Sequence, residues 1–329
     1  MNLRRLFAAS LLVLSPLAAV HGAPVAGAYP DKPVTLVVPY AKGSNGDNFG
    51  RSMARHIPPV LDSVSFVIEN KAGDSGIPAT VDLLKAAPDG YTLGLGRAGN
   101  LVIGPAMNPA TPYTVSSFTL LGVLEFDPLI CAVPAGSPHR SARDLFAAMR
   151  KAPGKLRYGS TGLASPQYFA ARYLLRLGGL PANAATNQNF ESSTESTVAL
   201  KEGRVDLVCG NAGNLIAAIK AGGVRGLFST APGRLPELPE LPNAQEVGLR
   251  DMSKLMGWTA LIGPPGMPPK VVARWRHAIT RLADNPDWRA ETMQYGGVPT
   301  VGTLKDNEGF IREQATLYKR LAPLLKAQP

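Results

Sequence analysis

Strands that end in short glycine-bearing loops, each followed by a helix, constrain the fold of this 329-residue chain more than any other feature. Residues 34–38 (VTLVV) read as a strand and lead into PYAKGSNGD. Residues 65–69 (SFVIE) lead into NKAGDSGIP, and residues 91–95 (YTLGL) lead into GRAGN. Strands that alternate with helices form a parallel sheet, because each helix returns the chain along the face of the sheet. The sequence therefore predicts an α/β fold.

The same loops predict a binding site. In open parallel sheets, ligands bind outside the carboxyl ends of the strands, which is where these loops lie. Glycine lets the backbone come close to a ligand, and a helix N-terminus offers unpaired N–H groups and a partial positive charge. No set of catalytic residues accompanies the loops. The pattern therefore indicates a site for a small anionic molecule.

The second half of the chain repeats the strand–helix alternation. A new series begins near Pro128 and includes the loops TGLASP and NAGN; a proline-rich connector, PGRLPELPELP, follows it. MGWTALIGPPG then reads as a return strand, followed by two amphipathic helices. We expect two α/β lobes, a two-strand hinge near residues 124–128 and 253–259, and a ligand cleft between the lobes. The expected parts are a signal peptide over 1–28, lobe 1 over 29–127, lobe 2 over 128–254, and a return to lobe 1 over 255–329.

The first 28 residues read as an export signal. Arg4 and Arg5 precede an apolar run over residues 6–20 that is too short to span a bilayer, and Ala-Gly-Ala ends the segment. We expect cleavage near Ala28 and a soluble periplasmic protein. Removing both arginines lowers the net charge from +10 to +8. The remaining basic residues are scattered without interleaved aromatic residues, so no nucleic-acid partner is expected.

The chain has two cysteines, Cys131 and Cys209, and both lie in apolar strand-like runs. An oxidising compartment would allow them to pair. A bond would require strand neighbours whose Cβ vectors face each other, which the sequence does not show. We therefore expect buried free thiols, with a disulfide as the alternative.

Six blocks of sequence carry a family resemblance. In chain order they are YPDKPVTLVVPYAKGSNGD, ENKAGDSGIPATVDLLKAAPDGYTLGLG, YGSTGLASPQY, LKEGRVDLVCGNAGN, LPELPNAQEVGL and GWTALIGPPGMPPKVV. Over nearly all of the mature chain, they resemble the periplasmic solute receptors of tripartite tricarboxylate transporters, the Bug-type or TctC-type receptors. The resemblance implies a type II periplasmic-binding-protein fold whose cleft closes over a small carboxylate. It also implies delivery to a membrane permease with one large and one small subunit.

The resemblance implies a set of ligand-binding residues from the loops of both lobes. They are Tyr40, Ser44, Asn45 and Asp47 in the first loop, Gly73, Asp74, Ser75 and Gly76 in the second, and Ser160, Thr161, Ala164, Ser165, Asn211 and Asn214 in the facing lobe. Within this set, we expect Asp47 to act mainly as a helix N-cap. Asn211 and Asn214 fit turn residues and ligand donors equally well. We expect a monomer without a cofactor, and no motif offers a metal site.

Some positions depart from the family pattern and bear on the ligand. Ser44 replaces a glycine, and Tyr168 replaces a histidine. Asp74 and Arg97 both replace small uncharged residues just past strand ends of lobe 1. Arg97 could pair with Asp74. Alternatively, Asp74 could receive an amino group while Arg97, with Thr161 and Ser165 opposite, binds a carboxylate, or both charged side chains could face solvent.

The leading hypothesis is a solute-binding receptor without catalytic activity. One alternative is a receptor that presents its ligand to a membrane sensor. A more remote one is a serine hydrolase that uses Ser75, because Gly-Asp-Ser-Gly resembles the nucleophile motif of trypsin-like proteases. That chemistry needs a histidine base. Only His56, His139 and His277 remain after signal removal, none in the expected setting.

Overall fold

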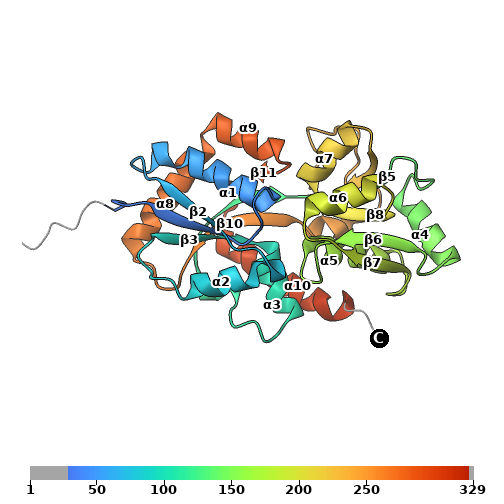
Figure 1. Cartoon of the computed structure of the whole chain (residues 1–329), viewed down its shortest axis with the longest axis horizontal. Coiled ribbons are helices and arrows are strands. Elements are labelled where there is room, and N and C mark those ends of the chain that lie inside the picture. The colour runs from blue at the N-terminus through green and yellow to red at the C-terminus, as the bar shows by residue number, and fades with distance from the viewer. Residues whose placement is uncertain (1–28, 326–329) are drawn as a thin grey trace, which may run out of the picture.

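The computed structural model describes residues 29–325, so the predicted export signal lies outside the described residues. Two α/β lobes lie side by side, each with its own sheet and its own helices (Figure 1). The predicted two-lobed α/β architecture is therefore confirmed. Within residues 29–325, no helix is both long and apolar enough to cross a membrane.

Lobe 1 holds a six-stranded sheet in the order β11-β4-β10-β3-β1-β2. Strand β1 pairs in parallel with β2 and β3, whereas β10 lies antiparallel between β3 and β4. The strands are β1 (Val34–Val38), β2 (Phe66–Asn70), β3 (Thr92–Arg97), β4 (Thr119–Asp127), β10 (Gly257–Gly263) and β11 (Val298–Pro299). Their helices are α1 (Asn45–His56), η1 (Pro58–Val60), η2 (Asp74–Gly76), α2 (Ile77–Leu84), η3 (Gly99–Ile103), α3 (Gly104–Met107), η4 (Val115–Ser117), α8 (Pro269–Ala283) and α9 (Pro286–Gln294).

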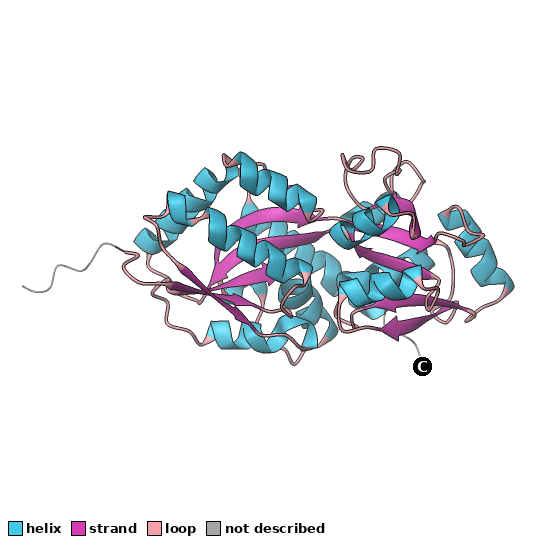
Figure 2. Ribbon diagram, turned by 45° about the horizontal axis from the view of Figure 1, so that its top comes forward, coloured by secondary structure: helices cyan, strands magenta, loops and turns pink. Residues whose placement is uncertain are grey.

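Lobe 2 holds a five-stranded sheet in the order β7-β6-β8-β5-β9. Its helices lie on both sides of the sheet (Figure 2). The strands are β5 (Leu129–Pro134), β6 (Leu156–Ser160), β7 (Ala185–Asn189), β8 (Leu207–Asn211) and β9 (Val224–Ser229). The helices are α4 (Ala142–Lys151), α5 (Pro166–Leu177), α6 (Ser193–Lys201) and α7 (Ala212–Lys220), and η5 (Arg250–Lys254) precedes the return to lobe 1.

The chain passes between the sheets at two adjacent places. Strand β4 ends at Asp127, and β5 begins in the other sheet at Leu129. The return strand β10 starts at Gly257, which lies opposite Asp127 in the antiparallel register of β10 and β4. A β-carbon at Gly257 would lie only 2.5 Å from the Asp127 carbonyl oxygen, so this position requires glycine. We refer to this place, where β4 and β10 run side by side and the chain passes between the lobes, as the crossing.

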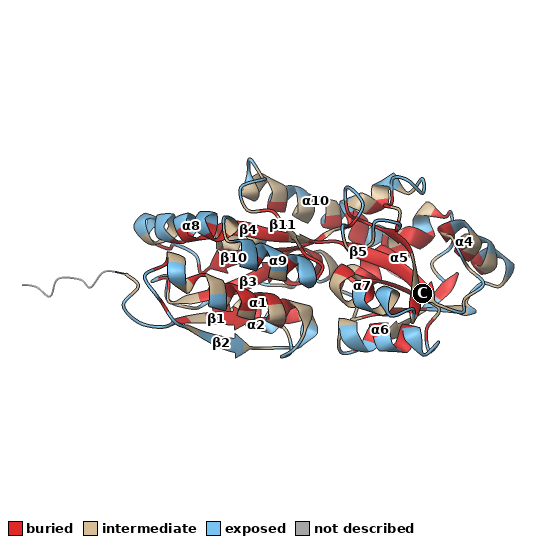
Figure 3. Cartoon of the chain, turned by 90° about the horizontal axis from the view of Figure 1, so that it is seen from above, coloured by how far each residue is buried: buried red, intermediate tan, exposed pale blue. Residues whose placement is uncertain are grey.

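The last helix, α10 (Asn307–Leu325), ties the lobes together behind the cleft. It begins over lobe 1 and ends against lobe 2 (Figures 1 and 3). The Tyr318 ring of α10 packs edge-to-face on Phe169 of α5, with ring centroids 5.3 Å apart. Arg172 of α5 donates from Nε to the Leu325 carbonyl oxygen at 3.0 Å. One apolar core therefore continues from lobe 1 through α10 into lobe 2.

Two glycines bring the backbones of the lobes into direct contact on another side. Gly213 is the second residue of α7 in lobe 2, and Gly296 lies two residues after α9 in lobe 1. A β-carbon on Gly213 would overlap the Tyr295 carbonyl group, and one on Gly296 would overlap the Gly213 backbone. Glycine is required here for close approach, because any side chain would separate the lobes.

The expectation of free thiols is wrong, because Cys131 and Cys209 form a disulfide. The two residues lie on β5 and β8, which are antiparallel neighbours, and their register places Cys131 directly opposite Cys209. Directly opposite residues on antiparallel strands have their side chains on the same face and close together. The sequence places each cysteine on a strand but does not state which strands are neighbours.

Removing the disulfide should lower stability markedly. It closes a loop of 78 residues, for which the loss of unfolded-state entropy corresponds to about 4.5 kcal/mol. We expect the double variant Cys131→Ala/Cys209→Ala to lose about that much free energy of unfolding in urea titrations. Reduced wild type should match it. Two thiols titrating in the unreduced, denatured protein would contradict the bond.

A methyl group at Gly213 should separate the lobes. We expect Gly213→Ala to raise the radius of gyration measured by small-angle scattering while the circular-dichroism spectrum is retained. Gly136→Ala is the matched control, because a β-carbon there meets nothing within 4 Å. Equal radii for both variants would show that the glycine contact does not limit how closely the lobes approach.

Candidate functional site

A cavity of about 540 Å³ lies between the lobes and receives side chains from both. The lobes approach closely there, since a β-carbon on Gly99 of lobe 1 would lie 3.7 Å from the Ala164 carbonyl oxygen of lobe 2. Most of the residues expected at the ligand line this cavity. They are Tyr40, Ser44, Asn45, Gly73, Asp74, Ser75, Gly76, Arg97, Thr161, Ala164, Ser165 and Asn211.

Four helix N-termini meet at the cavity, one from lobe 1 and three from lobe 2. Their N-cap residues are Ser44 for α1, Ser165 for α5, Ser192 for α6 and Asn211 for α7, and all four line the cavity. Each serine hydroxyl accepts a hydrogen bond from a first-turn N–H group. The partial positive charges of these helices therefore point toward one small volume, which favours an anion there.

Asp47 supports the first loop from behind, and its predicted role as the N-cap is wrong. Ser44 is the cap, because its hydroxyl accepts from Asp47 N at 3.3 Å. The buried Asp47 carboxylate instead accepts from Gly43 N at 2.7 Å, Arg51 Nε at 2.9 Å and Asn70 Nδ2 at 2.8 Å. Burial acts to raise the pKa of Asp47, but these donors outweigh it and hold the pKa below its usual range. Asp47 does not line the cavity.

The second loop is held in an unusual backbone conformation. Asp74 has φ 39° and Ser75 has φ 54°, values that L-residues adopt at a cost of roughly 1–3 kcal/mol and that glycine adopts freely. This conformation turns the loop so that all four residues from Gly73 to Gly76 line the cavity, with Asp74 exposed to solvent.

Arg97 pairs with Asp127, so of the alternatives left open for Arg97, a pairing with Asp74 is wrong. The Arg97 guanidinium donates from Nη2 to Asp127 Oδ2, and both side chains are buried. The guanidinium carbon also lies 5.6 Å from the centre of the Tyr40 ring, a favourable cation–π distance. The pairing follows from the sheet, because β10 separates β3 from β4 and the ends of both strands reach the crossing.

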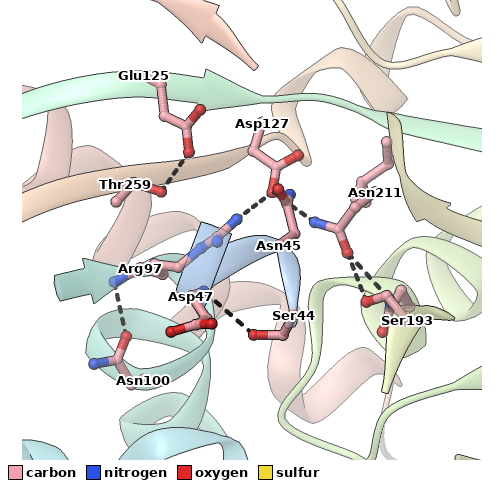
Figure 4. Close-up of polar contacts among 12 residues, drawn as sticks. Ser44, Asn45, Asp47, Arg97, Asn100, Glu125, Asp127, Ser193, Asn211 and Thr259 are labelled. Carbon is pink, nitrogen blue, oxygen red and sulfur yellow. Dashed lines mark hydrogen bonds and ion pairs between the residues drawn. The ribbon is translucent and has the colours of Figure 1, made fainter. Parts of the chain in front are cut away.

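Asp127, which our sequence analysis did not include, is the hub of the site (Figure 4). Besides Arg97, its Oδ2 accepts from Asn211 Nδ2 at 2.6 Å and Asn45 Nδ2 at 3.3 Å. Lobe 1 supplies Arg97 and Asn45, and lobe 2 supplies Asn211, so Asp127 joins both lobes at the crossing. An acidic residue directly before Pro128, at a predicted lobe boundary, is the signal that could have drawn attention to it.

The lobe 2 wall is a chain of hydrogen bonds that begins at Asn211. Its Oδ1 accepts from Gln167 Nε2 at 3.1 Å and Ser193 Oγ at 3.0 Å. Thr161 in turn donates to Gln167 Oε1 at 2.5 Å. Gln167 and Ser193 line the cavity and were also absent from the expected set. Because these polar side chains bind one another, the wall is held in place before any ligand arrives.

Besides Asp47, two expected residues lie away from the cavity lining. Ser160 is buried at the end of β6 and donates to Asn187 Oδ1 at 2.8 Å and Asn189 Oδ1 at 3.1 Å. Asn214 sits in the first turn of α7, and its side-chain nitrogen is buried without a partner among the described residues. Neither is placed to meet a molecule in the cavity.

A second buried carboxylate, Glu125, shares the crossing with Asp127. Thr259 of β10 donates to Glu125 Oε1 at 2.8 Å. Burial raises the pKa of Glu125 to about 8, with Asp127 adding to the rise and Arg97 opposing it. Asp127 holds the guanidinium and two amide donors, whereas Glu125 accepts from one hydroxyl, so the negative charge belongs on Asp127 and the proton on Glu125.

No histidine lines the cavity within the described part of the chain. His56 is engaged elsewhere, because its Nε2 lies 3.0 Å from Glu291 Oε2 on α9. His139 follows β5 in lobe 2, and His277 lies on α8. Among the described residues the Gly-Asp-Ser-Gly loop thus has no histidine base beside Ser75, and the arrangement suits binding of an anion better than acyl transfer.

These features define a two-lobed binding protein whose cleft is arranged for an anion. Residues 52–327 match the family described as tripartite tricarboxylate transporter family receptor, and the chain belongs to this family. It is 27% identical to Protein BugT of Bordetella pertussis over 320 residues, 95% of each chain. It is 29% identical to a UPF0065 protein of Pseudomonas sp. (strain P51) over 84% of this chain and 80% of that one.

Solved structures agree with the fold. MatC from Rhodopseudomonas palustris, determined with bound malate, is 26% identical with a TM-score of 0.80, covering 89% of this chain and 100% of MatC. A second R. palustris protein, determined with adipate, is 25% identical with a TM-score of 0.82, covering 92% and 99%. The periplasmic binding protein BugD, at 24% identity and a TM-score of 0.80, shares the fold.

The buried proton on Glu125 predicts a specific pH dependence. The folded pKa is about 8 and the ordinary value is 4.5, so the folded state binds this proton more tightly than the unfolded chain. The stabilisation is complete below pH 4.5 and is lost as the pH rises toward about 8. Relative to wild type, Glu125→Gln should therefore gain free energy of unfolding across that window in urea titrations. Parallel pH profiles for the two proteins would contradict the assignment.

Proposed function

We propose that this protein is a periplasmic receptor that captures a small carboxylate-bearing molecule, an organic acid, amino acid or related compound, for a tripartite tricarboxylate-type transporter. The observation that carries the proposal is the meeting of four helix N-termini at one cavity between the lobes. Membership in the receptor family supports it, as do the malate and adipate held by two similar proteins.

The interactions available are strong enough for useful affinity. Hydrogen bonds to a charged group contribute roughly 1.5–3 kcal/mol each, and a helix N-terminus adds about 0.3–1 kcal/mol. Three or four such contacts offset the cost of association and reach the ~8 kcal/mol of micromolar binding. Closure of the lobes about the crossing would exclude water and strengthen each contact. The expected ligand-binding residues that line the cavity are those we propose to contact the carboxylate.

We further propose that the protein acts without catalysis or a cofactor, as a monomer exported by its N-terminal segment and cleaved near Ala28. Its partner is a permease with one large and one small subunit. A membrane sensor is the alternative partner, and co-purification from membranes with a permease or with a sensor separates the two. No histidine lines the cavity in the described range 29–325, which supports a binding role over a hydrolytic one.

Filling the cavity should abolish capture. Native mass spectrometry of freshly purified protein, followed by denaturation, should release a small carboxylate from wild type. Ala164→Phe places a ring in the cavity, so the purified variant should release no carboxylate. Leu163→Phe is the matched control and should still release it, because Leu163 is 54% exposed and outside the lining. Retention of the solute by Ala164→Phe would place the site elsewhere. Turnover of a chromogenic ester that Ser75→Ala abolishes would favour a hydrolase.

A further inference from the structure

The donors at the floor of the cavity already hold a carboxylate, and it belongs to the chain itself. Asn45 and Arg97 from lobe 1 and Asn211 from lobe 2 all donate to one oxygen of Asp127 (Figure 4). The Asp127 side chain is only 1% exposed, so bulk water does not compete for these bonds. A cationic group with convergent amides is an arrangement that binds a ligand carboxylate, and here Asp127 occupies it.

The charged residues that line the cavity also argue against binding of a second ligand carboxylate. Four charged residues line it: Arg97, which is positive, and Asp74, Asp127 and Glu191, which are negative. The negative charge of Asp127 offsets the positive charge of Arg97 at the floor of the cavity. Asp74 from lobe 1 and Glu191 from lobe 2 are exposed, acidic residues at the rim of the cavity. The side chains therefore supply no net positive charge for a second carboxylate, and the rim repels one.

We propose that Asp127 takes the place of a second ligand carboxylate, so that this receptor selects monocarboxylates with a neutral or cationic remainder and rejects dicarboxylates. The inference rests on the proposed function. The single ligand carboxylate binds at the helix N-termini, and the rest of the ligand lies over the neutralised floor and the acidic rim. Selectivity in this protein therefore differs from that of the similar proteins determined with malate and adipate, both of which are dicarboxylates.

A dicarboxylate does not simply displace Asp127 from Arg97. Asp127 is held by its strand at the crossing, where its side chain is buried. Losing its donors would leave a buried negative charge without compensation, which is strongly unfavourable. Its second oxygen, Oδ1, already lacks a hydrogen-bond partner among the described residues. This unfilled acceptor favours a ligand donor, such as a hydroxyl or ammonium group, over a further acceptor.

Three probes with the same five-carbon chain test the proposal: valerate, 5-aminovalerate and the dicarboxylate glutarate. We expect isothermal titration to show wild type binding glutarate at least about tenfold more weakly than either monocarboxylate. Asp127→Ala frees Arg97 and its two amide neighbours, and it should bind glutarate at least about tenfold more tightly than wild type does. Asp127→Asn keeps the shape of the side chain and should shift affinity in the same direction if the alanine variant does not fold.

Glu291→Ala is the matched control. Glu291 is also a carboxylate paired with an arginine, Arg55, but it lies on α9 outside the cavity lining. Freeing Arg55 should leave glutarate affinity unchanged. Three outcomes would each overturn the inference. They are an equal gain in glutarate affinity in Glu291→Ala, no gain in either Asp127 variant, and equal affinity of wild type for glutarate and valerate. Failure of the proposed function is distinct, because wild type would then release no carboxylate on denaturation and bind none of the probes.

Discussion

The buried ion pair between Arg97 and Asp127 is the interaction on which the rest of the cleft depends. It lies where the chain passes between the lobes, and amides from both lobes complete it. A charge buried this deeply is tolerated only when its partners are fixed, because losing one partner leaves the other uncompensated. The pair therefore couples the geometry of the crossing to the electrostatics of the binding site, and movement of either lobe changes both.

Affinity for an anion comes from the architecture more than from any single side chain. In each lobe, loops at strand ends open helices whose N-termini face the cavity, so backbone dipoles supply the positive potential. Side chains then decide which anion is accepted. Asp127 cancels the one lining arginine, and acidic residues at the rim disfavour additional negative charge. The fold thus explains what the family shares, and the charged residues explain how this chain can differ within it.

Sequence reasoning succeeded where the physics is local and failed where it is not. The loops that open helices were placed correctly, and Ser44 and Ser165 in them cap the following helices. The predicted cap, Asp47, was wrong, and the contact that its carboxylate makes with Asn70, 23 residues away, could not be read from the sequence. For Arg97 the sequence left a pairing with Asp74 as one alternative among three, whereas the order of strands in the sheet brings Asp127 to it from 30 residues away.

By itself, the sequence determined the α/β class, the two lobes and the loops that border the cavity, since strand and helix periodicity, glycine turns and caps act over a few residues. Only the tertiary structure decided which distant groups meet. The disulfide joins residues 78 apart, Asn211 reaches Asp127 across 84, and Gly213 of lobe 2 meets Gly296 of lobe 1. Each of these contacts depends on strand order and lobe packing, and no local pattern of residues records either one.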